Sequence, residues 1–174
     1  MSPNRTLAAF QKPLLPGVAF AATKFHSGDD KAAFGNQLLA FIAEDFPERC
    51  FTQAFYLQLA RRFGLIAWYD KYGFWAEYFT RLPDKLCFLE QIVAYSCGGL
   101  PEYTFCDVER VVIQRLRSAG IVERLRAAAA QDREAIERAL LNKLIERYRP
   151  ELRPVGQPPA PRIADWASDQ SSLF

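Results

Sequence analysis

The residues of this 174-residue chain best suited to chemistry are one histidine and four cysteines. A cysteine nucleophile needs a neighbouring base, most often a histidine that accepts its proton. His26 lies in a stretch interrupted by prolines, ahead of the first expected helix, and no sequence spacing pairs it with a cysteine. We interpret His26 as a residue of an N-terminal arm, and we predict that the protein is not an enzyme.

The same residues could also supply zinc ligands, because Cys50, Cys87, Cys97, Cys106 and His26 provide enough donors. Structural zinc sites present their ligands in close pairs such as C-x2-C, however, and no two cysteines here are that close. Each cysteine lies in an apolar stretch, so we expect reduced, buried thiols rather than disulfides. The glycines match neither a phosphate loop nor a dinucleotide fingerprint. We therefore predict no metal and no cofactor.

The densest group of aromatic residues lies between residues 63 and 79. Tyrosine and tryptophan are enriched at interaction hot spots, and aromatic rings also stack on exposed bases. Large aromatic residues dominate protein cores equally well, so we interpret most of this segment as core. Two charged residues in its middle indicate that one turn reaches solvent. The candidate interaction residues there are Tyr69, Tyr72 and Trp75.

A second candidate surface is basic. Five arginines lie on the two expected helices between residues 107 and 130: Arg110, Arg115, Arg117, Arg124 and Arg126. The helices meet at Gly120, which gives them a weak likeness to a helix-turn-helix and suggests nucleic acid as the alternative partner. Glu109 and Glu123 interrupt the positive charge, as they would on an ordinary solvated face.

Proline-rich sequence begins at Pro150 and shows no periodic apolar face. We interpret residues 150–174 as a flexible tail, because closely spaced prolines favour an extended chain. The tail carries four apolar anchors: Ile163, Trp166, Leu173 and Phe174. Such anchors could fold into the groove of a partner or lie on the protein's own helices, and the sequence leaves both open.

The elements that must position these residues are helices. Apolar residues recur at helical spacing between residues 29 and 149, and no stretch alternates convincingly with a period of two. In the last expected helix, Ile136, Leu140, Leu144 and Tyr148 are spaced by four. The pattern predicts an all-α fold, a compact bundle or orthogonal array of six to seven helices in residues 29–149, with an irregular N-terminal arm in residues 1–28.

Composition narrows the classes of function. Half of the residues are hydrophobic, including fourteen phenylalanines, which predicts a packed aromatic core. The net charge of +2 is too small for a dedicated nucleic-acid or membrane binder, and no apolar run is long enough to span a bilayer. We expect a cytoplasmic, non-enzymatic protein-interaction module, such as an adaptor, inhibitor or subunit of a larger assembly, whose partner is another protein. Homo-oligomerisation stays open.

Overall fold

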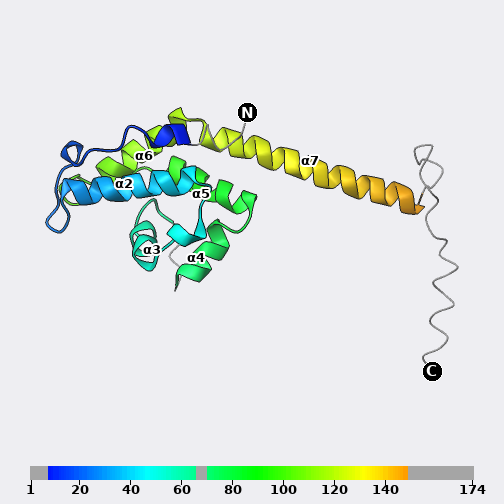
Figure 1. Cartoon of the computed structure of the whole chain (residues 1–174), viewed down its shortest axis with the longest axis horizontal. Coiled ribbons are helices and arrows are strands. Elements are labelled where there is room, and N and C mark those ends of the chain that lie inside the picture. The colour runs from blue at the N-terminus through cyan, green and yellow to red at the C-terminus, as the bar shows by residue number, and fades with distance from the viewer. Residues whose placement is uncertain (1–7, 66–69, 149–174) are drawn as a thin grey trace, which may run out of the picture. The chain divides into compact units, whose positions relative to one another are not determined.

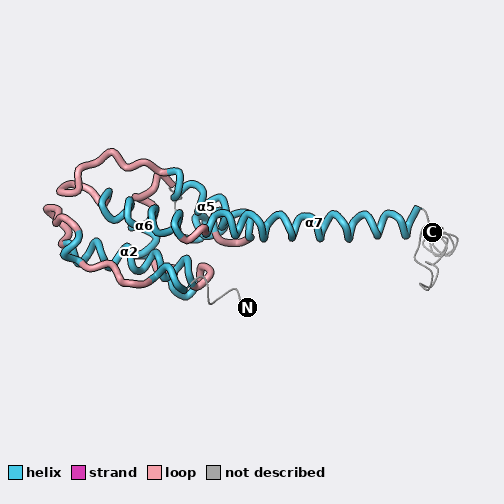
Figure 2. The backbone as a smooth tube through the Cα atoms, turned by 90° about the horizontal axis from the view of Figure 1, so that it is seen from above, coloured by secondary structure: helices cyan, strands magenta, loops and turns pink. Residues whose placement is uncertain are grey.

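The computed structural model describes residues 8–65 and 70–148, and this part of the chain is built from helices and loops without a strand (Figures 1 and 2). The α-helices described are α2 (Gly28–Ala43), α3 (Gln53–Leu59), α4 (Lys71–Tyr78), α5 (Leu82–Ala94), α6 (Cys106–Ser118) and α7 (Ile121–Tyr148). Three short 3-10 turns, Ala8–Gln11, Gly17–Ala19 and Glu48–Cys50, accompany them. The predicted all-α fold is confirmed.

The contacts divide the chain into two units, Met1–Ala129 and Ala130–Phe174. In the first unit, α2 is the most deeply packed helix. It begins with a capping box, in which the Ser27 hydroxyl accepts from the Asp30 amide and the Asp30 carboxylate accepts from the Ser27 amide. It ends at Ala43, because Asp45 and Phe46 adopt positive φ angles of 62° and 58° and turn the chain away from the helix axis.

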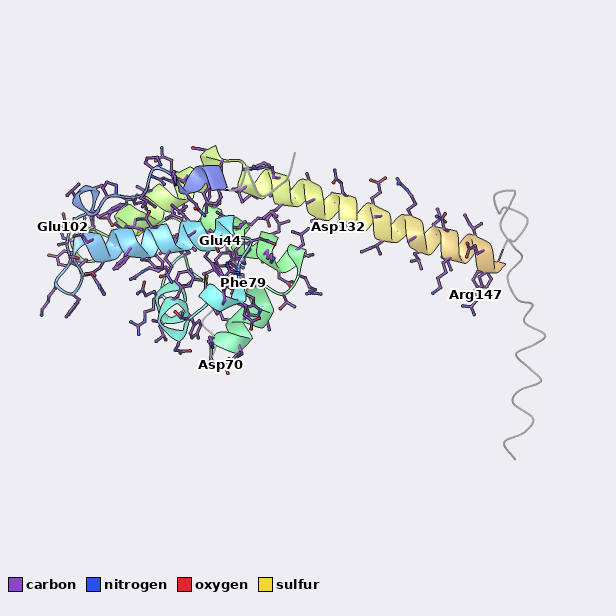
Figure 3. The ribbon with its side chains drawn as sticks, viewed as in Figure 1. Glu44, Asp70, Phe79, Glu102, Asp132 and Arg147 are labelled. Atoms are coloured by element: carbon purple, nitrogen blue, oxygen red, sulfur yellow. The ribbon has the colours of Figure 1, made fainter. Side chains whose placement is uncertain are left out.

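The aromatic-rich core predicted from composition lies between α2, α4 and α5. Phe79, at the end of α4, stands at its centre, with its ring centroid 5.2 Å from that of Phe41, 5.3 Å from Phe46 and 4.8 Å from Phe88. Most of these pairs meet edge to face, the arrangement that the ring quadrupole favours. Figure 3 labels Phe79 at this point.

The N-terminal arm packs on α2 and buries Phe10, Leu15 and Phe20, and hydrogen bonds from the Ala21 amide to Asp107 and from Arg115 to the Phe10 and Gln11 carbonyls join it to α6. The side-chain amide of Asn36 on α2 fixes it. Asn36 Oδ1 accepts from the Leu15 amide at 2.8 Å, and its Nδ2 donates to the Leu15 carbonyl at 3.1 Å. This pairing satisfies backbone groups that the arm would otherwise bury without partners.

The cysteines are only partly as expected. All four are free thiols, and Cys106 is buried, but Cys87 is exposed. The prediction of a buried Cys87 is wrong, because the apolar positions that follow it, Phe88, Leu89 and Ile92, take the inward face of α5 and turn Cys87 outward. Its sulfur accepts a hydrogen bond from the Gln91 side chain at 3.3 Å.

α7 begins in the core of the first unit, where Ile121 and Val122 are buried. A hydrogen-bonded ion pair of 2.6 Å between Arg126 and Glu90 holds its second turn to α5. Residues 127–130 are four consecutive alanines, the strongest helix formers, which carry the helix on from this anchored start. Within the described ranges, every helix is too short or too polar to cross a lipid bilayer.

Candidate protein-interaction surface

The second unit exposes a row of large apolar side chains on α7. Ile136, Leu140, Leu144 and Tyr148 recur every four residues and are 69%, 56%, 44% and 67% exposed. We call these four residues the α7 stripe, and Leu141 beside them is exposed as well. Figure 3 shows side chains standing out along this part of the helix, between the labelled Asp132 and Arg147. The stripe can bury a continuous apolar face against another helix.

The stripe differs from the other exposed apolar residues by its continuity. Twelve large hydrophobic residues in the described part of the chain are exposed, and five of them lie between Ile136 and Tyr148. The remaining seven are spread over the arm, the loops, α3 and α4. Isolated apolar residues are ordinary on protein surfaces, whereas contiguous ones mark interaction sites. The stripe is therefore the strongest candidate site.

The aromatic segment is mostly core, as interpreted from the sequence. Phe63, Phe74 and Phe79 are buried. Tyr72 is exposed and Trp75 half-buried, and both line a shallow cleft of about 470 Å³ whose lining also includes Phe51 and Lys71. The Lys71 ammonium lies 5.1 Å from the centroid of the Tyr72 ring. The structure thus brings two of the three aromatic candidates together, and Tyr69 lies outside the described residues.

Each of the five arginines makes a hydrogen bond or ion pair within the chain. Arg110 donates to the Cys97 carbonyl, Arg117 to the Val93 carbonyl, and Arg124 to the carbonyls of Ala119 and Gly120. Arg115, half-buried, donates to the backbone carbonyls of Phe10 and Gln11 at 3.5 and 3.3 Å. Arg126 pairs with Glu90. Each guanidinium therefore has a partner within the chain, mostly a carbonyl at a helix end or loop, where arginine caps orphan acceptors.

The apolar anchors proposed for the tail, Ile163, Trp166, Leu173 and Phe174, lie outside the described residues.

A buried ion pair links distant segments of the first unit, and the sequence analysis did not predict it. Lys31 on α2 is fully buried, and its Nζ donates to the Pro101 carbonyl at 2.7 Å and to both carboxylate oxygens of Asp107 at 3.1 and 3.2 Å. Asp107 also accepts from the Ala21 amide at 3.1 Å. The Lys31 ammonium thus joins three segments, which are α2, the loop that contains Pro101, and α6. The Asp107 carboxylate also binds the N-terminal arm.

A second group of polar side chains, the half-buried Arg62 and Cys97, lies around the buried Glu109 on α6. Burial raises the pKa of the Glu109 carboxyl, although its hydrogen bond with Cys97 and the positive charge of Arg62 act in the opposite direction. The Arg62 guanidinium lies 3.6 Å from the centroid of the Phe105 ring, a cation–π contact. Burial also raises the pKa of Cys97 to about 11. A thiol with this pKa is protonated at neutral pH and is a weak nucleophile.

The sequence did contain a signal for both buried charges. Lys31 precedes Phe34 by three residues and Leu38 by seven, so it occupies the inward face of α2. Glu109 stands three residues before Val112 and lies inward on α6 in the same way. A charged residue on an apolar helical face is almost never buried without a partner, and that rule points to an internal pair.

The described side chains contain no group of three or more histidine, cysteine, aspartate or glutamate residues that could hold a metal ion. Comparisons with protein-family models, with curated proteins and with solved structures find no match to this chain.

Proposed function

We propose that this protein is a non-enzymatic protein-interaction module that binds its partner through the α7 stripe. The exposure of four apolar residues on one helical row supports this proposal most directly. Burying a leucine, isoleucine or aromatic side chain contributes about 1.5–3 kcal/mol, so covering the stripe would stabilise a complex substantially. A helix face with this pattern is the usual ligand of an apolar groove or of another helix.

Two features of the first unit favour this proposal over the alternatives. The arginines that would have to contact phosphates are already bonded within the chain, mostly to backbone carbonyls. Burial raises the pKa of Cys97, the thiol hydrogen-bonded with Glu109, whereas a cysteine nucleophile needs a lowered pKa. The tail anchors are a proposed second contact with the same partner.

The proposal is tested by capture of protein partners on the immobilised full chain, with and without nuclease. The double variant Leu140→Ala, Leu144→Ala removes the centre of the stripe but keeps the helix, because alanine is the better helix former. The matched control is Leu57→Ala, Leu100→Ala, which truncates leucines that are 44% and 62% exposed in the first unit.

We expect a nuclease-resistant partner that the stripe variant loses and the control retains. Equal capture by both variants would contradict the proposal. Capture that disappears with nuclease would instead favour the nucleic-acid alternative and the arginines of α6 and α7.

A further inference from the structure

We propose that the partner covering the α7 stripe is a second copy of this chain, paired with it in antiparallel orientation about a two-fold axis at the level of Asn142. This inference rests on the proposed function, because it uses the same apolar face. It follows from the order of apolar and charged residues along the exposed part of α7.

In such a pair, residues equally far before and after Asn142 lie at the same level along the two helices. The stripe is symmetric about this position. Ile136 of one copy meets the level of Tyr148 in the other, and Leu140 meets the level of Leu144. Asn142 itself falls on the opposite side of the helix from the stripe, so the pairing buries no amide at its centre.

The charges follow the same symmetry with opposite signs. Glu137 of one copy reaches the level of Arg147 in the other, whereas Arg138, which pairs with Glu134 of its own helix, lies on the side of Asn142, away from the stripe. Glu137 and Arg147 both border the stripe, since Glu137 precedes Leu144 by seven residues and the Arg147 guanidinium lies 5.3 Å from the centroid of the Tyr148 ring. The two symmetry-related Glu137–Arg147 pairs are therefore attractive in the antiparallel arrangement.

A parallel pair in register would place every charge at the level of an identical charge, Glu137 beside Glu137 and Arg147 beside Arg147. Antiparallel helices also align their dipoles favourably. The charge pattern therefore selects both the second copy and its direction. The stripe extends only about 18 Å along the helix, so we expect a transient dimer with micromolar rather than nanomolar affinity.

The test is sedimentation of the full chain over a concentration series at low salt. The mass is expected to rise from that of one chain to that of two. Glu137→Arg and Arg147→Glu each turn two attractive pairs into two repulsive ones, and we expect each to weaken the dimer about tenfold. The double variant Glu137→Arg, Arg147→Glu restores both attractions and the dimer. Circular dichroism establishes that each variant retains its helices.

Four results would overturn the inference. The first is a wild-type chain that stays monomeric, and the second is a pair of single reversals that leave association unchanged, as they would in a parallel pair. The third is a double charge variant whose association is not restored. The fourth is association that persists in the double variant Leu140→Ala, Leu144→Ala. A monomeric full chain that dimerises once residues 149–174 are removed would assign the stripe to the chain's own tail. If the full chain is monomeric yet loses a different protein with the stripe variant, self-pairing fails and the proposed function stands.

Discussion

Replacing Lys31 by methionine should destabilise the first unit more than any other removal of a single charge. The substitution keeps an unbranched side chain of similar length but deletes the ammonium that bonds to Pro101 and Asp107. At 3.1 Å and an effective dielectric constant of about 20, the gross attraction between Lys31 and Asp107 is about 5 kcal/mol. Desolvation of the buried ammonium offsets part of it.

Removing one partner of a buried pair typically costs about 3–5 kcal/mol, because the other charge stays behind without compensation. Asp107 remains 16% exposed and keeps its bonds from the amides of Ala21 and Val108, so we expect the lower end, about 3 kcal/mol. For a unit of this size, each kcal/mol lowers the melting temperature by about 4 °C. The expected decrease is therefore about 12 °C.

The measurement is urea denaturation followed by circular dichroism, with Lys85→Met as the matched control. Lys85 Nζ lies 3.0 Å from a carboxylate oxygen of Asp45, but Asp45 is 60% exposed. An ion pair of that kind contributes below about 1 kcal/mol. If Lys31→Met cost less than about 1 kcal/mol, or no more than the control, the buried pair would not hold the helices together and the reasoning would be refuted.

Three further predictions concern other parts of the chain. Because burial raises the pKa of Glu109, the folded state favours its protonated form, and its contribution to stability falls as the pH rises above its ordinary value of 4.5. Glu109→Gln removes this titration. The free energy of unfolding of the variant, measured in urea and compared with that of the wild type, should therefore increase from acid to neutral pH. A difference between the two proteins that does not change with pH would contradict this prediction. Leu89 is fully buried, so Leu89→Ala should cost about 2–5 kcal/mol, and a loss below about 0.5 kcal/mol would place its side chain in solvent. The buried core residues described all precede Glu123. Deleting residues 150–174 should therefore preserve cooperative thermal unfolding while weakening partner binding. Loss of the cooperative transition would show that the tail belongs to the core.

Local signals in the sequence predicted the helices well, because caps and turns depend on residue type. Thr52 caps α3 by accepting from the Phe55 amide, and Gly64 and Gly120 adopt the positive φ angles expected after helix ends. These features require only a few neighbouring residues. A contact between residues far apart in the sequence does not depend on neighbouring residues alone. The sequence could therefore indicate that a buried Lys31 needs a partner, but it could not identify that partner as Asp107.

The sequence also could not predict that the apolar face of α7 is exposed, and the reason is a different one. Phe55, Leu59 and Phe63 are spaced by four and buried, whereas Leu140, Leu144 and Tyr148 have the same spacing and are exposed. Periodicity shows that a helix has an apolar face. It does not show whether that face meets the same chain or another one, because helices pack within and between chains by the same rules.

The bonds that fix the N-terminal arm have a consequence for synthesis on the ribosome. The Ala21 amide bonds to Asp107, and the Phe10 carbonyl bonds to Arg115, across separations of 86 and 105 residues. At a translation rate of about 5–20 residues per second, these two bonds can form only roughly 5–20 s after the arm is synthesised, whereas α2, which the arm also contacts, follows it directly in the chain. During that interval the arm, with its apolar residues Phe10, Leu15 and Phe20, has α2 but not yet α6 to pack against.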